Sequence, residues 1–253
     1  MNNDQIPGSA NKPKQYIQGW VEFYKLKFKV NPNVLIPRPE TELLVDAVLS
    51  FTRGCLAKLD HTVILDVGTG AGNIAISLSV NLSVNLKGCN VKIIATDVSA
   101  KALAVAKQNT KFHGVQKQIK FIKADLLNFN HKGERSFNFL INPDIIVTNL
   151  PYIPSARIPF LDSSVKDFEP QIALDGGEDG FELYRKLFEQ IKEKGWKPKF
   201  IIAEIDYTHG ELAKREAKKF FSNYQVEIEA DLTQKTRILK IIQRVNPVKP
   251  LQP

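Results

Sequence analysis

The sequence predicts an α/β protein with a doubly wound, mostly parallel sheet of seven strands, preceded by an N-terminal β-hairpin. Short apolar runs alternate with amphipathic segments from about residue 62 onward. A glycine-rich turn follows the first of these runs, and polar residues end the next three. Because parallel strands need a crossover connection, usually a helix, the alternation favours a sheet with helices on both faces.

The composition is that of an ordinary globular protein. The chain has 253 residues, of which 43% are hydrophobic and 25% charged, enough for one large domain with its own core. A net charge of +8 favours acidic partners, nucleic acid among them. Two cysteines without CxxC spacing and four scattered histidines predict neither a disulfide framework nor a metal site. The polar N-terminus and the lack of a membrane-length apolar run predict a cytoplasmic protein.

The segment before the alternating pattern has features of its own. Residues 20–30 alternate apolar and polar side chains on both sides of Tyr24 and Lys25, which predicts a β-hairpin. Three prolines exclude regular pairing from residues 31–40, called here the proline-rich loop. Apolar residues at helical spacing predict a helix over 41–51.

The alternating region supplies the sheet and its covering helices. Strands are predicted at the short apolar runs 63–66, 91–96, 119–122, 144–148, 200–204, 224–228 and 237–242, the last two as a possible hairpin pair. Helices are predicted at 73–82, between the N-cap Ser99 and Gly114, at 178–194 and at 209–221. We expect a flexible tail at 1–14, a unit of hairpin, loop and helix at 15–52, a main domain at 53–243 and a tail at 244–253.

The first strand of this region runs into VGTGAGN, where Gly68, Gly70 and Gly72 form the pattern GxGxG. Glycines permit a sharp turn and a close approach of a ligand, and the next helix directs free N–H groups toward it. The chain has no Gly-Lys dipeptide, which excludes a P-loop. A nicotinamide or flavin site is disfavoured because Asn73 stands where the third glycine of GxGxxG belongs. A tight turn without a ligand remains an alternative.

Acidic residues end the next two strands. Asp97 could bind both hydroxyls of a ribose, and Asp125 could reach an adenine amino group, with Leu126 against the ring. Each acid alone is commonly a cap or turn residue. Because the carboxyl ends of parallel strands share one edge of the sheet, the acids and the glycine turn together predict a nucleoside site.

The fourth strand ends in Asn149-Leu150-Pro151-Tyr152. The side-chain oxygen of Asn149 and the carbonyl of Leu150 could each accept one N–H of a planar NH₂ group, Pro151 stiffens the turn, and Tyr152 could supply an aromatic wall. Two acceptors would align a weakly nucleophilic amide nitrogen with an electrophile. An ordinary turn with a packing tyrosine is the alternative.

Together, DVGTGAGN, ATDVSAKAL, KADL and NLPYIP resemble class I S-adenosylmethionine-dependent methyltransferases of the (D/N/S)PPY type. More narrowly, the chain resembles the release factor glutamine N5-methyltransferases (the PrmC/HemK family) over residues 13–243, most specifically at 15–49, 168–187 and 203–211.

The resemblance implies a role for each motif. The glycine turn would wrap the methionine end of S-adenosyl-L-methionine through Gly68, Thr69, Gly70, Ala71 and Gly72. Asp97 would hold the ribose, and Asp125 and Leu126 would frame the adenine. Asn149, Leu150, Pro151 and Tyr152 would grip the glutamine amide of the GGQ motif in a release factor, with Asn149 also beside the cofactor. The segment Pro37-Arg38-Pro39-Glu40-Thr41 would lie over the site. Because no cysteine lies near these motifs, we expect direct methyl transfer without a covalent enzyme intermediate, and we expect a monomer.

The sequence departs from the family pattern at two points, and the first of them leaves an alternative substrate open. The usual tetrapeptide is NPPY, and NLPY also occurs in adenine-N6 methyltransferases acting on ribosomal RNA. An N6-adenine methyltransferase acting on RNA or DNA is therefore the second choice, and a non-catalytic cofactor-binding module the third. Few basic residues stand at 153–175, which disfavours the nucleic-acid substrate.

The second departure is at the N-terminus. Family members also carry an N-terminal helical domain, for which only about 14 residues stand here.

Overall fold

The structure is a computed structural model that describes residues 11–55, 61–85, 90–129 and 142–244. Most of both expected tails and Cys89 lie outside these ranges, and the side chain of Cys55 is not described. None of the helices in these ranges is long and apolar enough to cross a membrane. The same ranges contain no group of three or more His, Cys, Asp or Glu residues that could hold a metal ion.

Seven strands form one sheet in the order β5-β4-β3-β6-β7-β9-β8. They are β3 (His61–Val67), β4 (Asn90–Asp97), β5 (Ile119–Lys123), β6 (Ile145–Thr148), β7 (Phe200–Glu204), β8 (Tyr224–Ala230) and β9 (Thr236–Gln243). The first five are parallel, and β9 is antiparallel to both β7 and β8. This confirms the doubly wound sheet and the closing hairpin pair predicted from the sequence.

The N-terminal hairpin is also confirmed. Strands β1 (Trp20–Phe23) and β2 (Leu26–Lys29) pair antiparallel. The turn between them has positive φ at Tyr24 (51°) and Lys25 (59°), the backbone required by a two-residue hairpin turn. The backbone N–H of Tyr24 donates to Glu42 Oε1 at 2.7 Å, which ties the turn to the following helix.

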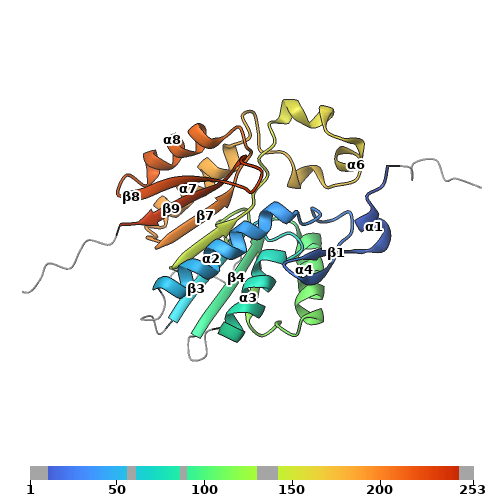
Figure 1. Ribbon diagram of the computed structural model, residues 1–253, viewed down its shortest axis with the longest axis horizontal. Helices are drawn as coiled ribbons and strands as arrows, with labels where there is room; N and C mark the ends of the chain where they lie inside the picture. Colours follow the sequence, from blue (N-terminus) through green and yellow to red (C-terminus); the bar gives the residue numbers. More distant parts are fainter. Residues whose placement is uncertain (1–10, 56–60, 86–89, 130–141, 245–253) are drawn as a thin grey trace, which may run out of the picture.

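Helices lie on both faces of the sheet (Figure 1). They are α1 (Lys14–Gln18), α2 (Glu42–Cys55), α3 (Asn73–Asn85), α4 (Ala100–Phe112), α6 (Ser163–Lys166), α7 (Glu182–Glu193) and α8 (Gly210–Phe220), with 3₁₀ helices η1 (Pro39–Thr41), η3 (Ser155–Phe160) and η4 (Gln171–Ala173). Helix α1, which takes up the last residue of the expected 1–14 tail, and the short helices between 155 and 173 were not predicted.

Three predicted helix boundaries are wrong by three or four residues. Helix α2 ends at Cys55 rather than at 51, and α3 ends at Asn85 rather than at 82. The sequence suggested a helix from 178 to 194, but α7 begins at Glu182. Gly177 and Gly180 have φ of 89° and 75°, which a right-handed helix does not allow. The Asp179 carboxylate accepts the N–H of Phe181 at 3.0 Å, so the chain turns there before the helix starts.

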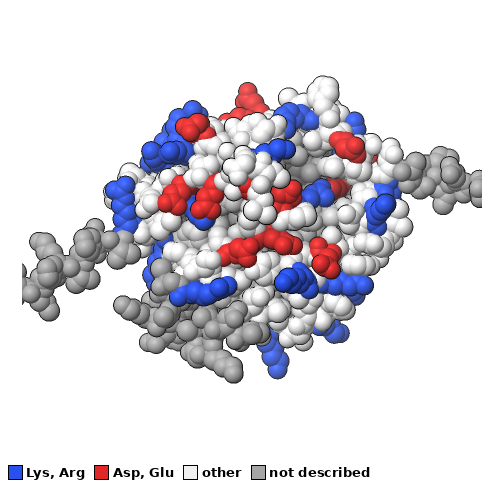
Figure 2. Space-filling model, viewed as in Figure 1, with Lys and Arg blue, Asp and Glu red and all other residues white. Residues whose placement is uncertain are grey.

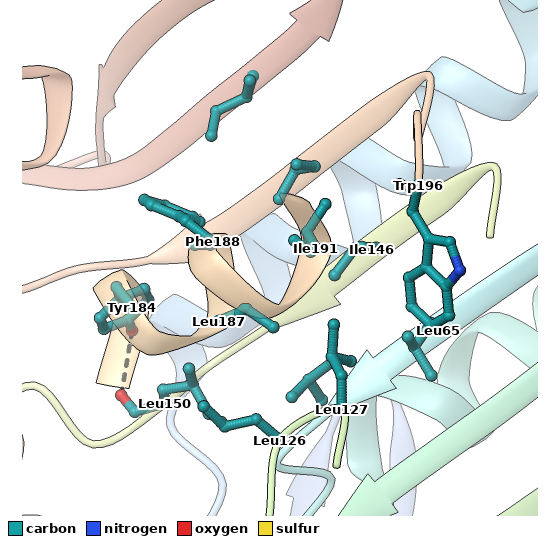
Figure 3. Close-up of a cluster of buried hydrophobic side chains, with 14 of the residues drawn as sticks. Leu65, Leu126, Leu127, Ile146, Leu150, Tyr184, Leu187, Phe188, Ile191 and Trp196 are labelled. Carbon is teal, nitrogen blue, oxygen red and sulfur yellow. Dashed lines mark hydrogen bonds between the residues drawn. The ribbon is translucent and has the colours of Figure 1, made fainter. Parts of the chain in front are cut away.

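The strands divide their side chains between two core clusters. Successive strand residues point to opposite faces, so Leu65 and Ile146 pack with α7 and α8, whereas Ile64 and Ile145 pack with α2 and α3. Figure 3 shows the first cluster, in which Leu126 and Leu150 from the strand ends meet Tyr184 and Leu187 of α7. The expected units 15–52 and 53–243 share the second cluster.

Helix α4 begins with a side-chain cap whose contribution to stability is testable. Ser99 Oγ accepts the N–H of Ala102 at 3.2 Å. We expect Ser99→Ala to lower the free energy of unfolding by about 1 kcal/mol because a helix N–H loses its acceptor. Urea unfolding measures the change, with Lys101→Ala on the exposed side of the same helix as the control. Equal midpoints for Ser99→Ala and the parent would contradict the prediction.

Candidate active site

A cavity of about 330 Å³ lies at the carboxyl ends of β3, β4 and β6, where a doubly wound sheet binds its ligand. Its volume lies within the roughly 300–1,000 Å³ typical of small-molecule sites. The cavity brings together all the site residues predicted from the sequence except Gly72 and Tyr152: Gly68, Thr69, Gly70, Ala71, Asp97, Asp125, Leu126, Asn149, Leu150 and Pro151.

The glycine turn is built for close packing. The N–H groups of Gly68 and Thr69 both donate to Thr96 O, at 2.9 and 2.8 Å, which binds the turn to the end of β4. Gly68 has φ of 75°, and a Cβ there would lie 3.0 Å from Leu150 Cδ2. A side chain at Gly68 would therefore push the turn away from the NLPY segment.

Gly72 has a different surrounding from Gly68 and Gly70. A Cβ at Gly72 would lie 3.1 Å from Ala106 Cβ on α4 and 3.1 Å from Ile76 Cδ1 on α3. Gly70, by contrast, has no atom within 4 Å of its Cβ position. Gly72 thus permits the close approach of two helices, and Gly70 leaves open space on the cavity side.

Asp97 holds the glycine turn as well as lining the cavity. Its Oδ2 accepts the N–H of Gly70 at 2.9 Å, and its Oδ1 accepts the N–H of Ser99 at 2.8 Å. Burial raises the pKa of Asp97, and these two hydrogen bonds lower it. Each carboxylate oxygen can accept a further hydrogen bond, so the group can still bind two hydroxyls.

The buried carboxylate of Asp66, near the end of β3, was not predicted as a site residue. Asp66 is fully buried and accepts a hydrogen bond from Thr69 Oγ1 at 2.7 Å. Burial raises the pKa of Asp66 to about 7, with the negative charge of Asp97 adding to the effect. The sequence did indicate this residue, because Asp66 is the first residue of the motif DVGTGAGN.

Asp125 and Leu126 lie at the same edge as expected. Leu126 is buried with a positive φ of 56°, which turns the chain sharply after β5. The Asp125 carboxylate is half exposed and forms an ion pair with Lys186 Nζ of α7 at 2.5 Å. Lys186 could not be predicted as the partner of Asp125, because it stands 61 residues away on another element.

Asn149 is held by its amide nitrogen. Nδ2 donates to Thr41 Oγ1 and to Glu204 Oε2, both at 3.0 Å. Within the described ranges no protein donor reaches Oδ1 of Asn149, so this oxygen keeps its capacity to accept. Glu204, at the end of β7, was not predicted as a site residue, and Thr41, at the end of η1, was expected only as part of the loop over the site.

The other three residues of the tetrapeptide divide between cavity and core. Leu150 lines the cavity yet its side chain is 3% exposed and belongs to the core beside α7 (Figure 3). Tyr184 Oη lies 3.1 Å from Leu150 O but nearer to Glu204 O, and it has one proton to donate. Tyr152 lies outside the cavity lining and donates to Glu204 Oε1 at 3.1 Å.

Two segments close the cavity. Pro37, Arg38 and Thr41 line it from the proline-rich loop and η1, as the sequence suggested, and Ile172 lines it from η4. Both segments lie at the same end of the molecule in Figure 1, near the label of α6 and the N-terminal hairpin. Arg38 forms an ion pair with the buried carboxylate of Glu169, which joins the two walls.

The fold and the site together define a methyltransferase of the Rossmann-like class. Asp97 can accept two hydroxyls, and the glycine turn, Asp125, Leu126 and Asn149 all line the same cavity. This donor and acceptor set fits an adenosine-containing cofactor.

Comparison with known proteins supports the same class. A family described as "Methyltransferase domain" matches residues 58–246. The chain is 36% identical to a release factor glutamine methyltransferase of Lactococcus lactis, covering 91% of this chain and 77% of that one. It is 35% identical to the protein of the same name from Bacillus cereus, covering 90% and 75%. The N-terminal domain of human METTL16, in complex with SAH, has the same fold, with a TM-score of 0.55 at 15% identity over 88% of this chain and 77% of that one.

The chain belongs to the release factor glutamine methyltransferase family, and its methyl donor is S-adenosyl-L-methionine.

Proposed function

We propose that this enzyme transfers a methyl group to the side-chain amide nitrogen of the glutamine in the GGQ motif of a peptide chain release factor. The observation that carries the proposal is Asn149, whose NH₂ group is bound by protein acceptors while its oxygen remains able to accept. The substrate places the reaction in translation termination, in the cytoplasm. We also propose that the enzyme acts as a monomer, because most of the residues assigned to cofactor and substrate line one continuous cavity.

Bound S-adenosylmethionine supplies an electrophilic methyl group on a sulfonium. In the proposal Asp97 accepts both ribose hydroxyls while it keeps the N–H groups of Gly70 and Ser99. Asp125 and Leu126 frame the adenine, and the glycine turn surrounds the methionine end, with Gly72 acting through helix packing.

The same proposal assigns the methyl acceptor to the NLPY segment. Asn149 Oδ1 and Leu150 O each accept one N–H of the glutamine amide, which leaves the nitrogen facing the methyl group. An amide nitrogen is a weak nucleophile because its lone pair is delocalised, so alignment and stabilisation of the developing charge by two fixed acceptors make the larger contribution. The nitrogen forms its bond to the methyl carbon as the carbon–sulfur bond breaks, and a proton then leaves the nitrogen to water.

The alternative substrate, an adenine in RNA or DNA, has less support. The named relatives are release factor glutamine methyltransferases. On the face shown in Figure 2, acidic side chains form a band across the middle, and separate basic side chains lie below this band and around the edge. A nucleic-acid backbone is bound by a continuous basic surface, which this face does not offer.

The function is tested by incubating the enzyme with methyl-labelled cofactor and either a release factor or a structured RNA. We expect label on the GGQ glutamine, located by peptide mass spectrometry. A release factor with alanine in place of this glutamine should remain unlabelled. Label on RNA adenine, with none on the release factor, would exclude the proposal.

The assignment of the adenine is tested separately at Asp125. We expect Asp125→Asn to weaken cofactor binding by less than about tenfold, because an amide oxygen still accepts one hydrogen bond from the adenine amino group. Calorimetry gives the dissociation constant. Lys186→Gln is the matched control, since it removes the partner of Asp125 and leaves the carboxylate. A larger loss of cofactor affinity for Asp125→Asn than for Asp97→Ala would reverse the assignment of ribose and adenine to these two residues.

A further inference from the structure

Glu204 is a buried carboxylate surrounded by the side chains of the proposed site. It ends β7 and is 1% exposed. Its Oε2 accepts from Thr41 Oγ1 at 2.7 Å and from Asn149 Nδ2 at 3.0 Å, and its Oε1 accepts from Tyr152 Oη at 3.1 Å. Three donors from two other segments of the chain thus converge on one carboxylate.

An ionised carboxylate only accepts hydrogen bonds, so it determines which end of the Asn149 amide faces it. The NH₂ end fits, and its two protons go to Glu204 and Thr41. The opposite orientation would place Oδ1 against the carboxylate. Thr41 could not relieve that contact, because its single hydroxyl proton is already donated to Glu204.

The orientation of this amide decides whether the proposed reaction can occur. With NH₂ bound by Glu204, Oδ1 is the end that can accept an N–H of the substrate amide. In the reversed orientation the substrate NH₂ would meet another NH₂ group, and neither can accept from the other.

We propose that Glu204 is a positioning residue for methyl transfer: with Thr41 as its bridge, it holds Asn149 in the one amide orientation that presents an acceptor to the substrate. The inference rests on the function proposed above. It also gives a role to Thr41, which ends η1 and lines the cavity next to the proline-rich loop.

The pH dependence follows from the groups around Glu204. Burial raises the pKa of Glu204, Glu40 acts in the same direction, and Arg237 with the hydrogen bonds from Thr41 and Tyr152 opposes it. Tyr184 of α7 faces only the backbone oxygen of Glu204. A protonated carboxyl can donate, so it no longer selects the NH₂ end of the Asn149 amide. The transfer rate should therefore fall as the pH decreases through the raised pKa.

This loss of rate is distinguishable from acid unfolding, because protonation of Glu204 raises the free energy of unfolding rather than lowering it. A carboxyl whose pKa is raised in the folded state binds its proton there before it does in the unfolded chain. The resulting stabilisation of the fold is complete below the pKa that the carboxyl has in the unfolded chain, and it is lost as the pH rises through the pKa in the folded state. Protonation of Glu204 therefore favours the fold while it lowers the rate.

The test compares Glu204→Leu, Glu204→Gln and Thr41→Val in the full chain, with a release factor as substrate. Glu204→Leu should lower kcat at saturating cofactor by roughly 10- to 50-fold through misalignment, with the cofactor dissociation constant changed less than about threefold. In Glu204→Gln the Gln oxygen can face Asn149 and its nitrogen Tyr152, so this variant should recover most of kcat and lose the acid limb of the pH profile.

Matched controls separate positioning from packing. Glu216 is a buried carboxylate outside the site, and Glu216→Gln should leave kcat and its pH profile unchanged. Thr52→Val is the corresponding control for Thr41→Val, because Thr52 is buried in α2, away from the cavity, and its hydroxyl donates to Leu49 O. If Glu204→Leu does not fold, Thr41→Val still has to lower kcat, by roughly three- to tenfold, and Thr41→Ser has to recover most of the loss.

The outcomes separate this inference from the proposed function. If the parent methylates the release factor and neither Glu204→Leu nor Thr41→Val lowers kcat, the positioning role is wrong and the function stands. An acid limb that persists in Glu204→Gln at saturating cofactor also overturns the inference. A parent that does not methylate the release factor overturns the function, and the inference with it.

Discussion

Replacing Asn149 with alanine should lower the rate of methyl transfer by roughly two to three orders of magnitude, the usual effect of removing one preorganised polar group. The substitution deletes the side-chain acceptor that the proposal assigns to the substrate amide. Cofactor affinity should change little, because most of the cavity lining comes from other segments. A single-turnover assay with a release factor isolates the transfer step from product release.

The control for this variant is the stability of the protein. Asn149 also satisfies Thr41 and Glu204, so its loss has some structural effect. Equal cofactor affinity and a cooperative thermal transition would show that the rate loss is chemical. If Asn149→Ala methylated glutamine at nearly the parental rate, the NLPY segment would be only a turn.

Asp97→Ala should weaken cofactor binding by roughly 30- to 150-fold, about 2–3 kcal/mol for the loss of a charged acceptor. Two causes act together. The ribose loses its acceptor, and the N–H groups of Gly70 and Ser99 lose theirs, so the glycine turn is less ordered. Calorimetric titration with the cofactor measures the effect.

The comparison with Asp97→Asn separates these causes. Asparagine keeps one oxygen and can hold one of the two backbone N–H groups. It should therefore bind the cofactor better than the alanine variant and worse than the parent. Affinity unchanged in both variants would remove Asp97 from the site.

The sheet and the cavity edge could be predicted because their signals are local. Each parallel strand is a short apolar run, and the buried sheet requires no more than that. The parallel arrangement then brings the strand ends to one edge, so Gly68, Asp97 and Asn149 could be placed together without knowing any contact. The short helices between 155 and 173 could not be predicted, because prolines and isolated turns there leave no periodic pattern.

The contacts that hold Asn149 were not predicted from the sequence. Thr41 and Glu204 are 163 residues apart and meet only through the tertiary fold. Glu204 does end a strand at the same edge, so the rule that found Asp97 and Asp125 applied to it as well. Its strand, FIIAE, runs into the segment 203–211 that carries part of the family resemblance, but the resemblance assigned no role to Glu204.

Leu150 shows how chemistry and sequence can vary independently at one position. Its proposed contribution to the reaction is a backbone carbonyl, which every amino acid possesses, whereas its side chain fills space beside Gly68 and Tyr184. Substitution at position 150 is therefore limited by side-chain volume and polarity rather than by reactivity. A proline at position 150 would keep the same carbonyl at the cost of repacking, so the identity of this residue by itself does not report which substrate is methylated.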